Sequence, residues 1–112
     1  MKKATTIPQE YWDEGLKRWS SHSFFNTINH WHVSDYSQEE TCDIMIVECK
    51  DGRFFIEDNW GGDAKGHADV FNPFERSSYP VFYSDFHSAN EAAAKIVASI
   101  TGSDYQKILI EE

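Results

Sequence analysis

Histidine and cysteine are the side chains of this chain that could bind a transition metal. The sequence holds five histidines and two cysteines, and neutral imidazole and thiolate are preferred zinc ligands. It has no Cys-x-x-Cys and no His-x-x-x-His pair, although His30 and His32 could place two imidazoles on one face of a strand. Because further ligands would have to come from elsewhere, we predict no metal and no cofactor, with both histidines as half-exposed strand residues.

Acid–base or nucleophilic chemistry is a second possibility. Asp85 and His87 could orient a nucleophile such as Ser84 or Ser88, but Ser88 is explained more simply as a helix cap. With 19 acidic residues, carboxylate pairs will occur by chance on almost any fold. A small metal-dependent or hydrolytic enzyme that uses His67, His87 and nearby carboxylates therefore remains an alternative, and the prediction is that no residue is catalytic.

The segment 58–69 mixes oxygen-bearing side chains with glycines, as calcium loops do. An EF-hand loop needs oxygen donors at its third and fifth positions. Counting from Asp58, these positions hold Trp60 and Gly62, so the register is wrong for calcium. No glycine here is followed by the Lys-Ser or Lys-Thr of a phosphate-binding loop either.

Length and composition favour one folded domain over residues 1–112. A chain of 112 residues with 40% apolar and 15% aromatic side chains can bury one core. Its net charge of −9 excludes the basic surface that a nucleic-acid or anionic-membrane binder needs. The first residues are charged and polar, and no apolar run reaches the roughly 18 residues of a membrane span. We therefore expect a cytoplasmic protein with no direct nucleic-acid or membrane partner.

A hairpin at about 41–59 is the centre of the expected fold. Asp51-Gly52 is a strong signal for a two-residue turn, and it separates two strand-like runs, 41–50 and 53–59. The first run is apolar on both faces, as in a central strand that is covered from two sides. Its two cysteines, Cys42 and Cys49, would lie about 20 Å or more apart, too far to form a disulfide.

Two helices are expected to pack on this sheet. Thr6 and Gln9 can cap a helix at about 7–19. Ser88 and Glu91 form a Ser-x-x-Glu capping box before an alanine-rich helix at about 89–101 that Gly102 ends. The predicted fold class is therefore α+β.

Three further strands complete the prediction. Residues 28–35 are rich in β-branched and aromatic side chains, although a helical stripe also fits part of the segment. Residues 79–85 read as a strand with Pro80 at its start, near a sheet edge, and residues 105–110 alternate as a last strand. The glycine-containing loop at 60–78 is long enough to suggest a functional role.

Acidic charge is concentrated in the middle of the chain. Residues 35–69 contain ten acidic and three basic side chains. One interpretation is a solvated surface that keeps the protein soluble. The other is a surface that docks on a basic partner, where complementary charge speeds and selects association and aromatic side chains act as anchors. The predicted partner-binding residues are Asp35, Glu39, Glu40, Asp51, Glu57, Asp58, Trp60, Asp63, Asp69 and Phe74.

The function predicted from this pattern is a non-catalytic, protein-binding inhibitor or adaptor. Its partner would present a basic surface, such as the nucleic-acid-binding site of a larger complex. In size and charge alone the chain is similar to the small acidic anti-restriction and anti-CRISPR inhibitors of phages and mobile elements. An oligomeric structural subunit is a further alternative, with a homodimer formed at the exposed sheet edge near Pro80.

Overall fold

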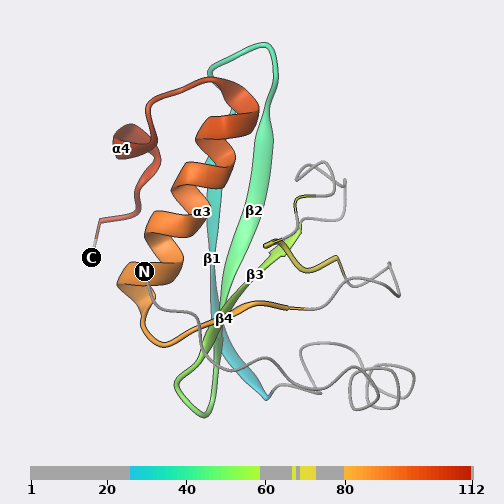
Figure 1. Cartoon of the computed structure of the whole chain (residues 1–112), viewed down its shortest axis with the longest axis vertical. Coiled ribbons are helices and arrows are strands. Elements are labelled where there is room, and N and C mark those ends of the chain that lie inside the picture. The colour runs from blue at the N-terminus through green and yellow to red at the C-terminus, as the bar shows by residue number, and fades with distance from the viewer. Residues whose placement is uncertain (1–25, 59–66, 68, 73–79, 112) are drawn as a thin grey trace.

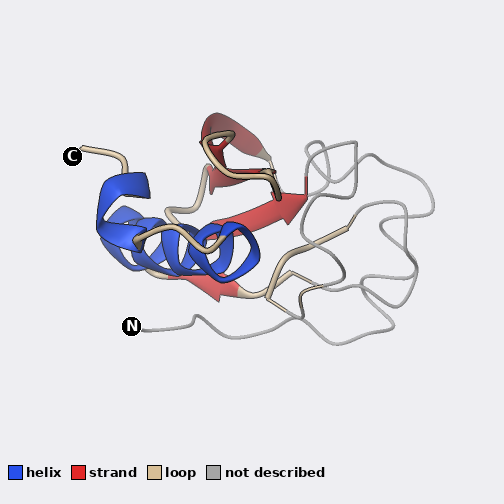
Figure 2. Ribbon diagram, turned by 90° about the horizontal axis from the view of Figure 1, so that it is seen from above, coloured by secondary structure: helices blue, strands red, loops and turns tan. Residues whose placement is uncertain are grey.

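The computed structural model describes residues 26–58, 67, 69–72 and 80–111. The helix predicted at 7–19 lies outside the described residues. The described elements are, in chain order, β1 (Thr27–Asp35), β2 (Cys42–Cys49), β3 (Phe54–Asp58), β4 (Phe82–Tyr83), α3 (Phe86–Thr101) and α4 (Tyr105–Ile108). The strands form one antiparallel sheet in the order β1-β2-β3-β4, and α3 lies across one face of it (Figures 1 and 2). The α+β class is confirmed.

The central hairpin is confirmed, but its turn is longer than predicted. The backbone N–H of Cys49 donates to the carbonyl of Arg53 at 2.8 Å, and that of Gly52 donates to the carbonyl of Cys49 at 3.0 Å. The loop is therefore Lys50-Asp51-Gly52. Gly52 has a φ of 92°, whereas Asp51 keeps a negative φ. A two-residue type I′ turn needs positive φ at both central positions, so the chain adopts the three-residue form that places glycine alone in the left-handed region.

The strand predicted at 28–35 is confirmed as β1, an edge strand paired with β2. A register shift between Thr27 and Asn29 marks a bulge near its start. Beyond the bulge Trp31 and Val33 face α3, while His30 and His32 lie on the opposite face. Alternation of apolar and polar side chains thus assigns one face of β1 to the core.

The strand predicted at 79–85 is much shorter, because the described β4 contains Phe82 and Tyr83 only. It is at the sheet edge, as predicted for the neighbourhood of Pro80. Phe71 pairs with the same edge of β3 as β4 does. Its N–H donates to the carbonyl of Ile56, and its carbonyl accepts from the N–H of Asp58, both at 2.8 Å. Two separate segments therefore share the hydrogen-bonding groups of this edge.

Helix α3 begins three residues earlier than predicted, and its cap is Asp85, not Ser88. The Oδ1 atom of Asp85 accepts a hydrogen bond from the N–H of Ser88 at 2.7 Å. The earlier start brings Phe86 into the helix, where its ring meets that of Trp31 edge-on at 4.8 Å. Such an aromatic pair contributes about 1 kcal/mol beyond burial. The end at Gly102 is confirmed by its φ of 86° and its N–H bond to the Ala98 carbonyl.

The core lies between α3 and the sheet. Small and β-branched side chains of the helix, Ala89, Ala93 and Val97, are buried in one cluster with Ile44 and Ile56. Alanine at these positions lets the helix backbone approach the strands closely. The other face of the sheet is buried as well and contains Met45, Val47, Phe55, Phe71 and Phe82. β2 is therefore the central, doubly covered strand that the sequence predicts.

The prediction of a last strand at 105–110 is wrong, because residues Tyr105–Ile108 form the short helix α4. Asp104 Oδ1 accepts from the N–H of Gln106 at 3.1 Å, so a local cap competes successfully with the strand pattern. Beyond α4, Ile110 exchanges two hydrogen bonds with the Asn90 side chain, at 2.8 and 3.0 Å. Among the described helices, none is long and apolar enough to cross a membrane.

Candidate protein-binding surface

The acidic residues predicted to bind a partner do not form one surface. Asp51 lies in the hairpin turn at one end of β2, whereas Glu39 and Glu40 lie in the β1–β2 connection at the other (Figure 1). The eight residues of β2 span roughly 25 Å. A single small contact therefore uses one of these ends and leaves the other free.

Two of the predicted carboxylates are buried. Glu57 is 5% exposed and Asp58 6% exposed at the end of β3, so neither contributes to an open acidic surface. Adjacent strand residues point to opposite faces of the sheet, and β3 is buried at every residue, so both of its faces are covered. The sequence prediction did not include Asp43 on β2, which is also buried.

The long loop contributes few described residues. Trp60, Asp63 and Phe74 lie outside the described residues, so their role in binding stays a prediction. Asp69 is half-buried, and its backbone N–H donates to His67 Nδ1 at 3.2 Å. Burial, and secondly the charge of Asp69, raise the pKa of Tyr83 to about 12.

The β1–β2 connection, residues 36–41, is exposed along its whole length and is here named the acidic turn. Asp35 organises its start: Oδ1 accepts from the N–H and hydroxyl of Ser37, and Oδ2 accepts from the hydroxyl of Ser103. These hydrogen bonds, that of Ser103 first, hold the pKa of Asp35 well below its usual range. Asp35 therefore acts as an ionised anchor of the turn.

Tyr36 is the prominent aromatic side chain of the acidic turn, with 64% of its surface exposed. Its hydroxyl donates to Asp43 Oδ2 at 3.1 Å, while Asp43 Oδ1 lies 3.0 Å from His32 Nδ1. The buried carboxylate thus fixes an exposed ring at the start of the turn that carries Glu39 and Glu40. Sequence reasoning missed Tyr36; an aromatic residue inside a polar connection between two strands was the available signal.

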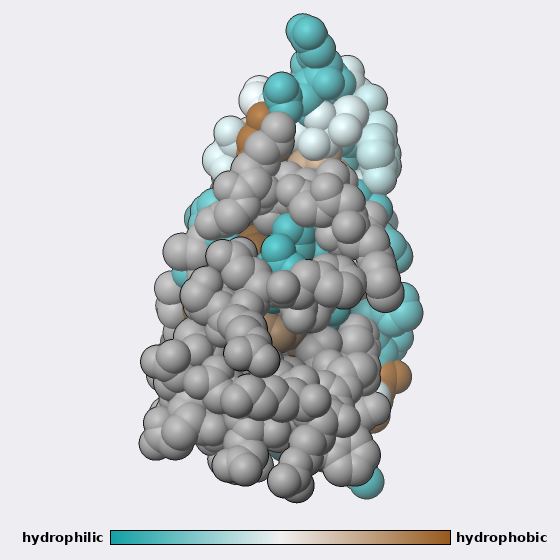
Figure 3. Space-filling view, turned by 90° about the vertical axis from the view of Figure 1, so that its right-hand side faces the viewer, coloured by the Kyte–Doolittle hydropathy of each residue, from teal (hydrophilic) through white to brown (hydrophobic). Residues whose placement is uncertain are grey.

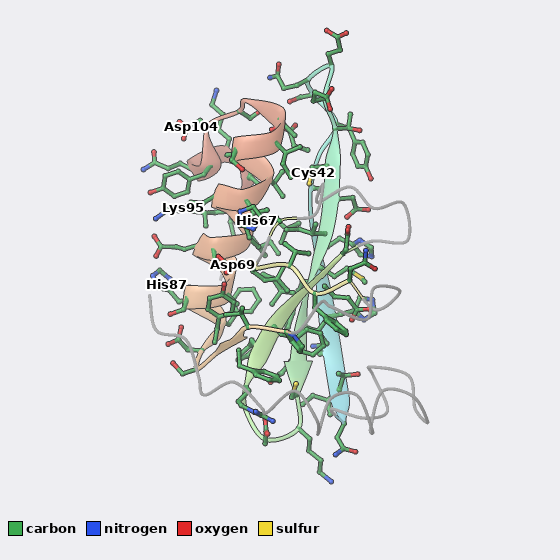
Figure 4. All side chains as sticks on the ribbon, turned by 45° about the vertical axis from the view of Figure 1, so that its right-hand side comes forward. Cys42, His67, Asp69, His87, Lys95 and Asp104 are labelled. Atoms are coloured by element: carbon green, nitrogen blue, oxygen red, sulfur yellow. The ribbon has the colours of Figure 1, made fainter. Side chains whose placement is uncertain are left out.

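The end of α3 extends the same surface. Ser103 contacts Asp35, and the exposed Asp104 follows it directly. Figure 4 shows Asp104 toward the end of the molecule that carries the acidic turn, and Figure 3 shows hydrophilic residues at that tip. The acidic end is defined here as Tyr36, Glu39, Glu40 and Asp104.

Two of the residues considered for catalysis, Asp85 and Ser88, form the start of α3. Asp85 caps α3, and its hydrogen bonds from Ser88, backbone first, lower its pKa. Ser88 is buried in the first turn of the helix. His87 is exposed and lies 3.7 Å from Glu91, one helical turn onward. In the described part of the chain, no group of three or more His, Cys, Asp or Glu side chains is placed to hold a metal ion.

No protein-family profile matches the chain, and neither the curated proteins nor the solved structures contain a significant match.

Proposed function

We propose that this chain is a non-catalytic protein-binding module that docks through its acidic end onto a basic surface of a partner protein. One observation carries the proposal: an exposed tyrosine at the start of the exposed acidic turn is held by the buried carboxylate of Asp43 on β2. The assignment narrows the surface expected from sequence to one end of the molecule.

The acidic end combines the two contributions that a charged interface needs. Glu39, Glu40 and Asp104 supply negative charge that steers a basic partner and selects against acidic ones. Tyr36 supplies apolar area and a ring face that can receive an arginine or lysine. Since the hydrogen bond to Asp43 already orients the ring, little conformational entropy is lost on docking.

The chemistry of the partner follows from this surface. A groove lined with lysine and arginine, such as the nucleic-acid site of an enzyme, complements carboxylates in the way that it complements phosphates. The chain would then act as an inhibitor by occupying that groove. This is the mode of action of small acidic inhibitors as a class, and the net charge of −9 supports it.

A binding experiment with matched charge variants tests the proposal. A partner is first captured from the native host with the full chain, and its affinity is then measured by titration at several salt concentrations. Tyr36→Ala is expected to weaken binding about tenfold, and Glu39→Gln is expected to weaken it while reducing the salt dependence. Asp51→Asn removes the same charge at the opposite end and should have no effect.

Two results would contradict the proposal. Equal weakening by Glu39→Gln and Asp51→Asn would show that net charge matters and that the acidic end does not. Binding that is independent of salt and unchanged in Tyr36→Ala would place the interface elsewhere.

A further inference from the structure

Two histidines stand side by side on the sheet face opposite α3. His30 and His32 share this face of β1, and both are exposed. Their ring centroids are 5.9 Å apart with the planes at 73°. Their spacing by two residues on a strand is what directs both rings to the same side.

One of the two rings is already oriented as a metal ligand would be. Asp43 Oδ1 lies 3.0 Å from His32 Nδ1, and 53% of the His32 side chain is exposed. Because an ionised carboxylate can only accept a hydrogen bond, neutral His32 carries its proton on Nδ1 and its lone pair on Nε2. Histidines that bind metals typically donate their other ring N–H to a carboxylate in this way, which fixes the tautomer and raises ligand basicity.

The carboxylate is itself held in place. Asp43 is only 11% exposed in its side chain, and its second oxygen accepts from the Tyr36 hydroxyl. Its position on β2 is set by the pairing of Ser34 with Asp43. Two independent contacts thus hold the group that orients His32.

We propose that His30 and His32 bind one divalent ion of the zinc class through ring nitrogens, with Asp43 as the positioning residue and solvent at the remaining coordination positions. Zinc–nitrogen bonds of about 2.0–2.1 Å in tetrahedral geometry put two imidazole centroids roughly 5 Å apart. This is slightly less than the observed separation of 5.9 Å, so the two rings have to move closer together to bind one ion. Imidazole nitrogen favours zinc, copper and nickel over magnesium and calcium.

The site is open, because the side chains of His30 and His32 are exposed, although the same face of the sheet is buried at β2 and β3. An ion with two protein ligands keeps exchangeable positions, as catalytic sites do and closed structural sites do not. The expected binding is therefore reversible and not required for folding.

Titration of the full chain with Zn²⁺ alone, in a buffer that does not chelate, tests the site by calorimetry. One ion per chain is expected. His30→Gln and His32→Gln should each weaken binding about tenfold or more, whereas His87→Gln should not. His87 is a matched control, since it is an exposed histidine on α3, away from the sheet (Figure 4).

The role of Asp43 has its own test. Asp43→Asn is expected to weaken zinc binding about 10- to 100-fold and to change the ring-nitrogen NMR shifts of His32. If this variant fails to fold, the wild-type nitrogen spectrum decides: a protonated Nδ1 and a zinc-shifted Nε2 on His32 support the assignment, and the reverse overturns it. Unchanged affinity in both histidine variants, or half an ion per chain, would also overturn the proposal.

Discussion

The hydroxyl of Ser103 donates a hydrogen bond to Asp35, a residue 68 positions earlier in the chain. This contact joins the end of β1 to the residue that follows the C-cap of α3. It ties the acidic turn to the helix layer at the end where we place the partner.

The pKa of Asp35 should respond to removal of this hydroxyl. Ser103→Ala takes away the largest cause of the lowered pKa, so the Asp35 pKa should rise toward its usual range in an NMR titration. A carboxylate with a lowered folded pKa stabilises the protein above the unfolded pKa, and this stability is lost as pH falls. The variant should therefore lose less stability in acid than the wild type. Ser99→Ala, at a hydroxyl bonded to the Ile96 carbonyl, is the control. An unchanged Asp35 titration would refute the assignment.

The helix cap can be assigned by comparing two substitutions. Asp85→Ala should lower the melting temperature more than Ser88→Ala, because Asp85 accepts the hydrogen bond that caps α3. Asp85→Asn should keep most of the cap at neutral pH. Since the folded pKa of Asp85 is lowered, its contribution is present above the unfolded pKa and disappears as pH falls, and the asparagine variant should lack this loss. A larger effect of Ser88→Ala would restore the assignment made from sequence.

At Tyr83 we expect the buried aromatic ring to stabilise the fold and the buried hydroxyl group to destabilise it. Its hydroxyl is buried and has no hydrogen-bond partner among the described residues. Tyr83→Phe should therefore raise the free energy of unfolding by about 1 kcal/mol, measured in urea. With its pKa raised to about 12, Tyr83 makes the wild type lose stability as pH rises from about 10 to 12, whereas the variant should lose less. Tyr105→Phe is the half-exposed control; equal effects of both substitutions would contradict the assignment.

Substitution of Gly52 in the hairpin turn tests the effect of backbone strain alone on stability. Gly52 has a φ of 92°, and nothing lies within 4 Å of the position that a Cβ atom would occupy. Gly52→Ala should destabilise the protein by about 1–2 kcal/mol through φ alone, and Gly52→Asn should cost less because asparagine tolerates the left-handed region. Lys50→Ala in the same loop should be nearly neutral. A neutral Gly52→Ala would indicate that the turn changes its type.

Both cysteines should be inert in the folded protein. Cys42 and Cys49 are free and buried, and burial, with a smaller contribution from the Asp51 charge, raises the Cys49 pKa to about 12. Thiolate is the reactive form, so labelling with a disulfide reagent should occur only at the rate of unfolding. The same reagent should react at once in urea. Fast labelling under native conditions would show that a cysteine is accessible.

Local signals explain the elements that were predicted correctly. Asp51-Gly52 and the apolar runs beside it identified the hairpin, and the β-branched and aromatic residues of 28–35 identified β1. Predictions failed where two local patterns competed. At 105–110 the cap at Asp104 prevailed over alternation, and at the start of α3 the cap at Asp85 prevailed over the one predicted at Ser88.

The sequence by itself determined the class of fold, the central strand and the excess of acidic charge, because these follow from periodicity, turn chemistry and composition. Only the tertiary structure decided which charges share a surface. Cover on both faces of the sheet buried Glu57 and Asp58, and strand pairing separated Asp51 from Glu39 by the length of β2. Strand pairing also brought Asp43 between Tyr36 and His32, and the packing of α3 on the sheet brought Ser103 to Asp35. Such contacts depend on strand pairing and helix packing between residues far apart in the chain, and no local pattern encodes them.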